Sequence, residues 1–219
     1  MSFKVEFKNY LDDLHKSLCE VSDWMYENPE LGFQEFKTSK HLVDYIQKNS
    51  KSVNYPSHGL ETAFDVTFGD NGPLIVICVE YDALPEIGHA CGHNIIATAS
   101  IGAGLGLKDI ASKLGIRVKL LGTPAEEGGG GKIILINEGA FEDASCSMMI
   151  HPGYEDVVNP TFTTIEQYTV EYFGKDAHAA GAPDQGINAL DAQIQLFVNA
   201  STYRQQMVQS LSLIHISEP

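Results

Sequence analysis

The architecture of this chain follows from one segment, Val79-Glu80-Tyr81-Asp82-Ala83-Leu84-Pro85-Glu86-Ile87-Gly88-His89-Ala90-Cys91-Gly92-His93-Asn94. It begins at the end of an apolar run, residues 74–79, that is typical of a buried strand, and it ends where a long helical pattern starts. Cys91 and His93 are separated only by Gly92, so a tight turn can direct a sulfur and an imidazole at one point. Thiolate and imidazole suit zinc and its first-row neighbours. The segment therefore predicts a strand, a turn that carries metal ligands, and a helix.

Strands and helices alternate on both sides of this segment. Strand patterns lie at 62–68, 74–79, 117–122 and 144–150, and helical patterns lie at 3–28, 34–48, 95–114 and 132–138. This alternation predicts an α/β fold with a mixed, mostly parallel sheet flanked by helices. From about residue 163 an alternating strand pattern at 165–173, a turn-rich loop and a helical pattern at 188–209 predict the start of a smaller α+β domain.

Composition narrows the possible partners and the compartment. The formal net charge is −15, from 29 acidic against 14 basic residues, which argues against nucleic acid or an anionic membrane surface as a partner. No apolar run approaches the length of a membrane span. The four cysteines are widely spaced and form no CxxC pair, which indicates reduced thiols, and we expect a cytoplasmic protein.

Two further strand patterns are followed by side chains that can bind a metal. Glu126 and Glu127 follow the strand at 117–122, and His151 follows the strand at 144–150. Taken singly, the acids are compatible with a solvated turn and the histidine with a satisfied core residue. Parallel strands end at one edge of a sheet, so these residues are expected to converge with Cys91 and His93. A metal hydrolase needs one acid on the metal and one free to move a proton, and adjacent residues can supply both.

Two glycine-rich runs do not predict a nucleotide site. In the run Gly128–Lys132, Glu126 stands where a phosphate-binding loop needs its first glycine, and Ile133 stands where that loop needs Ser or Thr. The run at 102–106 lacks the third glycine of a dinucleotide fingerprint and lies inside a helical pattern.

Six short segments carry a resemblance to a known family: Asn28-Pro29-Glu30-Leu31-Gly32-Phe33, Tyr81-Asp82-Ala83-Leu84-Pro85, His89-Ala90-Cys91-Gly92-His93-Asn94, Pro124-Ala125-Glu126-Glu127, His151-Pro152 and Gly174-Lys175-Asp176-Ala177-His178-Ala179. With these segments in this order, the sequence resembles the M20 metallopeptidase/amidohydrolase family, in the branch with a cysteine in its metal site. At Asn94 it resembles the subgroup of dipeptidase-like members and aminobenzoyl-glutamate hydrolases.

The resemblance implies a hydrolase with two divalent metal ions, zinc or manganese. It implies four metal ligands and one general base: Cys91, His93, Glu127 and His151 as ligands, and Glu126 as the base. His178, on a lid domain that also forms a homodimer, would polarise the scissile carbonyl from the partner subunit; from the sequence alone it is equally compatible with a surface histidine. Asp82 would orient a ligand imidazole. Glu80 stands where other branches place a ligand histidine, and His89 is expected to support the loop; we assign neither a ligand role.

The expected substrate is a small molecule, a dipeptide or an N-acyl amino acid, whose amide bond is hydrolysed. Two alternatives stay open: a catalytically inactive metal- or ligand-binding fragment, and a structural zinc protein with a closed four-ligand site. We expect residues 1–162 to form the N-terminal part of the catalytic domain and 163–210 the start of the lid. We interpret residues 211–219 as an artefactual tail that resembles a translated sequencing adapter, with the last metal ligand beyond the chain. Such a chain should be poorly soluble and nearly inactive.

Overall fold

The computed structural model describes residues 2–48, 50, 53–158, 160–161, 164, 166, 168–208 and 211. The chain divides into two compact units, Met1–Glu155 and Asp156–Pro219, and each is described here by itself. The domain boundary expected after residue 162 stays a prediction. Residues 212–219 of the expected tail lie outside the described residues.

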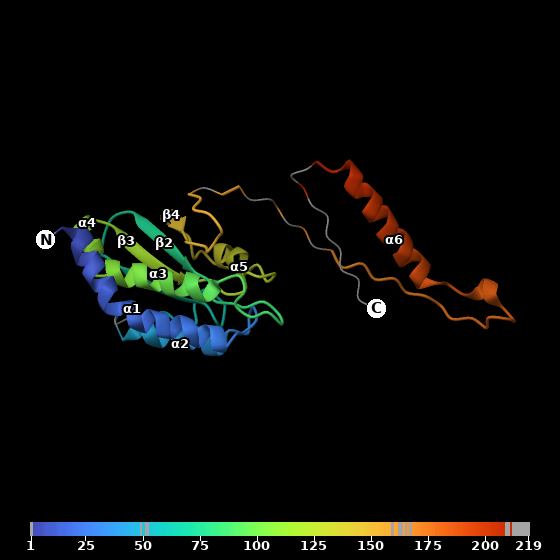
Figure 1. The fold of residues 1–219 in the computed structure, drawn as a ribbon, viewed down its shortest axis with the longest axis horizontal. Coiled ribbons are helices and arrows are strands. Elements are labelled where there is room, and N and C mark those ends of the chain that lie inside the picture. Colours follow the sequence, from blue (N-terminus) through green and yellow to red (C-terminus); the bar gives the residue numbers. More distant parts are fainter. Residues whose placement is uncertain are drawn as a thin grey trace. The chain divides into compact units, whose positions relative to one another are not determined.

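The first unit is built on a four-stranded sheet with the order β1-β3-β2-β4 (Figure 1). Its strands are β1 (Phe64–Phe68), β2 (Leu74–Val79), β3 (Arg117–Gly122) and β4 (Ala144–Met148). The central strand β2 runs parallel to β3 and to β4, whereas β1 runs antiparallel to β3. The mixed, mostly parallel sheet predicted from the sequence is therefore confirmed.

Helices cover both faces of the sheet, because alternate side chains of its strands point to opposite faces and both faces are apolar. The helices of this unit are α1 (Phe3–Glu27), α2 (Phe36–Gln47), α3 (His93–Leu107), α4 (Ala111–Leu114) and α5 (Gly131–Asn137). On β2, Ile77 and Val79 join the core cluster formed with α1, α2 and α3. Val76 and Cys78 point to the other side, where they join the cluster that contains Leu135 of α5. The period of two along β2 thus produces a three-layer arrangement.

The helix predicted at 95–114 is interrupted. It ends at Leu107, and α4 begins only at Ala111. The break allows Ile110 to turn into the core, where it is 2% exposed. Gly115 then closes α4 with a φ of 66°, a left-handed conformation that glycine adopts at little cost. A hydropathy pattern averaged over the whole span does not reveal such a local turn.

The second unit contains one long helix, α6 (Ala189–Tyr203), with short 3-10 turns η1 (Pro183–Gln185) and η2 (Arg204–Gln206). The strand predicted at 165–173 is wrong for described residues 168–173, which form no strand. A strand needs a partner strand for its backbone hydrogen bonds. Within the described part of this unit the pairing is limited to the bridge between Lys175 and Ile187.

Among the described helices, none is both long enough and apolar enough to cross a lipid bilayer.

Candidate metal centre

The candidate site lies at the carboxyl edge of the three parallel strands. Asp82 follows β2, Glu126 and Glu127 follow β3, and His151 follows β4. His93 is the first residue of α3, and Cys91 precedes it on the turn. The strand ends predicted to converge are adjacent because β2 pairs with both β3 and β4.

The turn at Gly92 brings Cys91 next to His151. Gly92 has a φ of 86°, and a Cβ atom at this position would lie 2.9 Å from Cγ of Pro152. Only glycine fits there without a shift of the backbone or of the proline. The turn therefore packs against Pro152 in the segment after β4. As a result, Cys91 Sγ lies 3.4 Å from His151 Nε2.

Both imidazoles present the Nε2 atom to the site. The Nδ1 atom of His93 lies 3.1 Å from Asp82 Oδ1, and the Nδ1 atom of His151 lies 2.7 Å from the carbonyl oxygen of Pro152. A carboxylate or carbonyl oxygen accepts a hydrogen bond, so in the neutral ring each Nδ1 carries the proton. Each Nε2 atom then offers a lone pair, as a metal-binding histidine requires.

Three carboxylates surround His93 Nε2. The nearest oxygens of Glu80, Glu126 and Glu127 lie 3.4, 3.6 and 3.8 Å from this nitrogen. Two groups of ligand atoms each lie within 4.8 Å of one another and share His93: the first is Cys91, His93 and His151, and the second is Glu80, His93 and Glu126. One imidazole nitrogen has one lone pair, so the two groups cannot both bind an ion through His93 Nε2.

Unpartnered polar atoms indicate that the residues fit a divalent cation. Among the described residues, neither His93 Nε2 nor Glu80 Oε2 has a hydrogen-bond partner, although both atoms are buried. Such atoms are costly in a protein interior unless something binds them. Two atoms bound to one zinc ion at tetrahedral angles lie about 3.4 Å apart. The observed separations of 3.4 Å, from Glu80 Oε2 to His93 Nε2 and from Cys91 Sγ to His151 Nε2, match this spacing.

The same crowding of charges shifts the pKa values of the site. Burial, followed by the neighbouring Glu127, raises the pKa of the Cys91 thiol to about 12. Burial also raises the pKa of Glu126, and the charge of Glu80 adds to this. For His93, burial would lower the pKa, but the hydrogen bond to Asp82 and the carboxylates outweigh it and raise the value. A cation would favour the ionised forms of Cys91 and Glu126, whereas at His93 it must compete with a proton for Nε2.

Asp82 also orients the acidic turn after β3. Burial would raise its pKa, but hydrogen bonds from His93 and from the Glu127 amide outweigh burial and lower it. The Glu127 N–H donates to Asp82 Oδ2 at 2.8 Å. One carboxylate therefore fixes both an imidazole and the backbone of the neighbouring acid, which is more than the sequence predicts for Asp82.

Two residues at the site were given no role from the sequence. Glu80 is 1% exposed and forms an ion pair with Lys132, the second residue of α5. Their separation of 52 residues hides the contact from any local pattern. A signal was nevertheless present, because an acid that directly follows a buried strand needs a cation nearby.

A third residue without an assigned role, Glu35, forms a hydrogen bond with the turn that follows β3. Its buried carboxylate accepts hydrogen bonds from the Ala125 N–H at 2.8 Å and from the Thr62 hydroxyl at 3.0 Å. Ala125 has a φ of 53°, which is unfavourable for a residue with a side chain. Glu35 thus holds the residue immediately before Glu126 in a strained conformation.

His178 lies in the second unit, so its position relative to the metal ligands is not described. Its ring is exposed, and Nδ1 accepts hydrogen bonds from the backbone N–H groups of Gly181 at 2.9 Å and Ala180 at 3.3 Å. With Nδ1 as acceptor, the proton of the neutral ring resides on Nε2.

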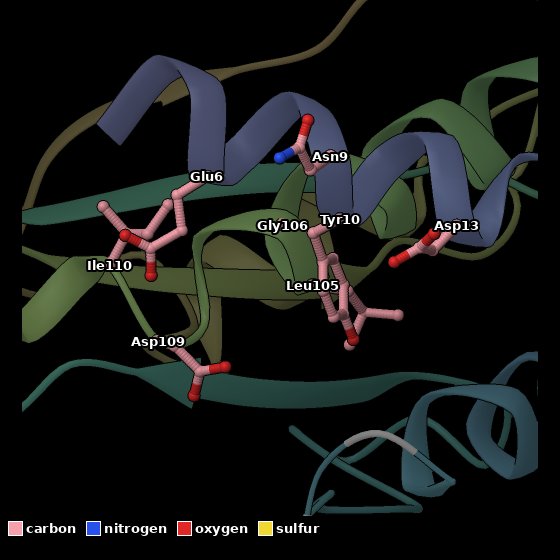
Figure 2. Close-up of a pocket in the computed structure, with 8 residues that line it drawn as sticks. All are labelled: Glu6, Asn9, Tyr10, Asp13, Leu105, Gly106, Asp109 and Ile110. Carbon is pink, nitrogen blue, oxygen red and sulfur yellow. The ribbon is translucent and has the colours of Figure 1, made fainter. Parts of the chain in front are cut away.

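A cavity of about 220 Å³ lies elsewhere on the first unit, between α1 and the end of α3 (Figure 2). Its lining includes Glu6 and Asp13 on α1 and Leu105 on α3, and none of the predicted site residues. At 1.5 Å per residue, Leu105 is about 18 Å along α3 from His93. This cavity is therefore separate from the ligand cluster.

The chain is similar to several characterised hydrolases, although no family model matches it. It is 38% identical to the Xaa-Arg dipeptidase of Mus musculus, over 90% of this chain and 49% of that protein. It is 28% identical to a p-aminobenzoyl-glutamate hydrolase chain of Escherichia coli, over 96% of this chain and 48% of that protein. The chain thus spans about half the length of these curated relatives.

Two solved structures are also similar to this chain. A dinuclear metal binding peptidase of the M20 family from Bacillus subtilis superposes with a TM-score of 0.56 and 25% identity, over 62% of this chain and 42% of that chain. A putative aminohydrolase from methicillin-resistant Staphylococcus aureus superposes with a TM-score of 0.66 over 94% of this chain and 58% of that chain; at 20% identity it supports the fold alone. From its relatives, its fold and its cluster of ligand side chains, the chain belongs to the M20 family of metallopeptidases and amidohydrolases.

Proposed function

We propose that this chain is part of a metal-dependent hydrolase that cleaves the amide bond of a dipeptide or an N-acyl amino acid. The observation that carries the proposal is the meeting of Cys91 Sγ and His151 Nε2 at 3.4 Å beside the buried, unpartnered Nε2 of His93. The relatives named for Xaa-Arg dipeptidase and aminobenzoyl-glutamate hydrolase activity support the same reaction class.

The proposed ligands are Cys91, His93, Glu127 and His151, with two divalent ions, zinc or manganese, in the complete protein. The mixture of thiolate, imidazole and carboxylate suits zinc, and the carboxylates also suit manganese. The similarity to a dinuclear peptidase supports two ions. When bound, such ions polarise the scissile carbonyl and make the attacking water more acidic.

Glu126 is proposed as the general base. Its side chain is 41% exposed, so it can reach a water that enters from solvent, and its Oε2 lies 3.6 Å from His93 Nε2. Burial and Glu80 raise its pKa, which brings the carboxyl closer to the range in which it can both accept and return a proton. Glu126 would take a proton from the attacking water and deliver it to the departing amine.

His178 is proposed to stabilise the negative charge that develops on the carbonyl oxygen. Its Nδ1 accepts backbone hydrogen bonds, so the ring can donate from Nε2. The exposed loop that carries it is compatible with a role in a homodimer, in which His178 would reach the site of the partner subunit. We also propose a cytoplasmic location, in keeping with the four free cysteines.

The test pairs metal content with the rate of hydrolysis at enzyme excess, because the chain spans about half the length of its curated relatives. Dipeptides that end in arginine and N-acyl amino acids are the first substrates, with Mn²⁺ or Zn²⁺ added. Glu126→Ala should keep its metal and lose about 10²–10⁴-fold in rate. Glu142→Ala, at an exposed acid, is the matched control and should leave both quantities unchanged.

Each other outcome has a distinct meaning. Because a nearly inactive chain is expected, only normal metal content with no hydrolysis above the metal-free background at enzyme excess would favour the inactive metal-binding fragment. One tightly held ion that excludes an exchangeable water would favour a closed structural zinc site. An unchanged rate in Glu126→Ala would overturn the assignment of the general base.

A further inference from the structure

The glycine run at 128–131, just before α5, does not fit a nucleotide site. It positions Lys132 beside the carboxylate of Glu80. A Cβ atom on Gly131 would lie 1.8 Å from the carbonyl oxygen of Pro124, so α5 begins in direct contact with the turn after β3. The Gly131 N–H donates to the carbonyl oxygen of Ala125 at 3.1 Å. Lys132 follows immediately and pairs with Glu80.

The two carboxylate oxygens of Glu80 have different surroundings. Oε1 is bound by the Lys132 ammonium group, whereas Oε2 is buried, makes no hydrogen bond among the described residues, and lies 3.4 Å from His93 Nε2. The Glu80 side chain is 2% exposed and that of Lys132 is 31% exposed. Lys132 can therefore swing outward into solvent on its flexible stem, whereas Glu80 must remain in the site.

Charge makes the two ligand groups unequal. The group of Cys91, His93 and His151 combines soft sulfur with nitrogen and contains no ammonium ion. The group of Glu80, His93 and Glu126 already contains the positive charge of Lys132 through Glu80. An ion that enters the acidic group must displace this ammonium or be repelled by it.

We propose that Lys132 is a built-in counter-cation that makes metal loading sequential: a first divalent ion enters beside Cys91 and His151, and a second enters on the Glu80 side of His93 only in competition with the Lys132–Glu80 pair, with Glu126 left free as the proposed base. This proposal rests on the proposed function, because it concerns the same centre. Lys132 is a positioning residue in this account, since it acts on the metals through Glu80.

A Co²⁺ titration of the metal-free chain tests this order. A thiolate ligand gives cobalt a charge-transfer absorption band, so the band reports the Cys91 position, and calorimetry counts both ions. The parent chain should develop the full band with the first equivalent and bind a second ion about tenfold or more weakly. Lys132→Gln, which is neutral but can still donate a hydrogen bond to Glu80, should tighten the second ion about tenfold and change the first by less than about threefold.

Two controls separate the charge of Lys132 from other effects. Lys132→Arg should behave as the parent does because it keeps the positive charge. Lys113→Gln removes a lysine from a solvent-facing pair with Glu6, at 2.8 Å, and should change neither ion. An unchanged second ion in folded Lys132→Gln would overturn the proposal.

A measurement on the unmodified sequence covers the case in which Lys132→Gln fails to fold. Acetylation of lysine amines, read by mass spectrometry, should leave Lys132 protected with none or one equivalent of Co²⁺ and modify it after the second, with the exposed Lys8 as the reference. Protection that does not change on the second equivalent would overturn the order of loading. Absence of the thiolate band in every variant would instead overturn the proposed metal centre itself.

Discussion

Asp82 Oδ1 lies 3.1 Å from Nδ1 of His93, at the first turn of α3, and this contact fixes which nitrogen the imidazole presents to the site. The other oxygen of Asp82 accepts the Glu127 N–H at 2.8 Å. Two of the four proposed ligands are therefore oriented by a single carboxylate that lies at the end of the central strand.

Asp82→Asn should weaken metal binding while leaving the fold in place. The amide can keep one of the two contacts but lacks the charge that holds the imidazole proton on Nδ1, and loss of such support costs about 10–100-fold in metal affinity. Competition with a chromophoric chelator measures this loss. Asp70→Asn, at an exposed acid that contacts Ser112, should have no effect on affinity; an equal effect in both variants would mean that net charge, not orientation, is responsible.

Metal affinity should rise with pH because Cys91 must lose its proton. Burial and Glu127 raise the pKa of this thiol to about 12, so at neutral pH the free protein holds the proton and the metal complex does not. The first bound ion should therefore release about one proton from Cys91 into the buffer. Calorimetry in buffers of different ionisation enthalpy measures the release. Cys91→Ser should lack it, and a pH-independent affinity for the parent would show that Cys91 is not a ligand.

Gly92→Ala should uncouple Cys91 from His151. The added Cβ would meet Pro152 at 2.9 Å and would also force a side chain into a φ of 86°. Left-handed conformations cost a residue with a Cβ about 1–2 kcal/mol, and the clash moves the sulfur as well. We expect a lower unfolding midpoint together with loss of the Co²⁺–thiolate band.

Gly153→Ala is the matched control for this change. Its Cβ would lie 3.6 Å from the Glu155 carbonyl oxygen, an ordinary contact, so this variant should keep both the stability and the band. Retention of the band in Gly92→Ala would contradict the role of the turn.

Glu35 should give the protein a measurable dependence of stability on pH. Burial raises its pKa above the ordinary 4.5, so just above pH 4.5 the folded protein keeps a proton that the unfolded chain has lost. The free energy of unfolding must then fall as pH rises through this window and stay lower above the folded pKa. Urea titrations of Glu35→Gln should lack this fall, so Gln gains relative to Glu towards neutral pH.

Glu35→Ala separates the hydrogen bonds of this carboxyl from its charge. It leaves the buried Ala125 N–H without its acceptor and should cost about 1–3 kcal/mol below the folded pKa of Glu35, and less above it. Parallel pH profiles for the parent and Glu35→Gln would show that the carboxyl is not responsible for the slope.

The sequence allowed the strand ends, and hence the meeting of Cys91, His93 and His151, to be predicted because apolar runs identify strands and parallel strands share an edge. The pairing of Glu80 with Lys132 could not be found in this way, because it depends on how closely Gly131 approaches Pro124. A local sequence pattern also gave a wrong prediction where strand formation depends on a partner strand. Residues 168–173 alternate as a strand does but have no neighbouring strand among the described residues to pair with.

The position of β2 between β3 and β4 has a consequence for how the site moves. Its amides are bonded on both sides, so they should be among the slowest in the chain to exchange their hydrogens with heavy water. Glu80 and Asp82 hang directly from the end of this strand. Local fraying of the edge strand β4 would therefore release His151, whereas these two acids should stay in place until the centre of the sheet unfolds.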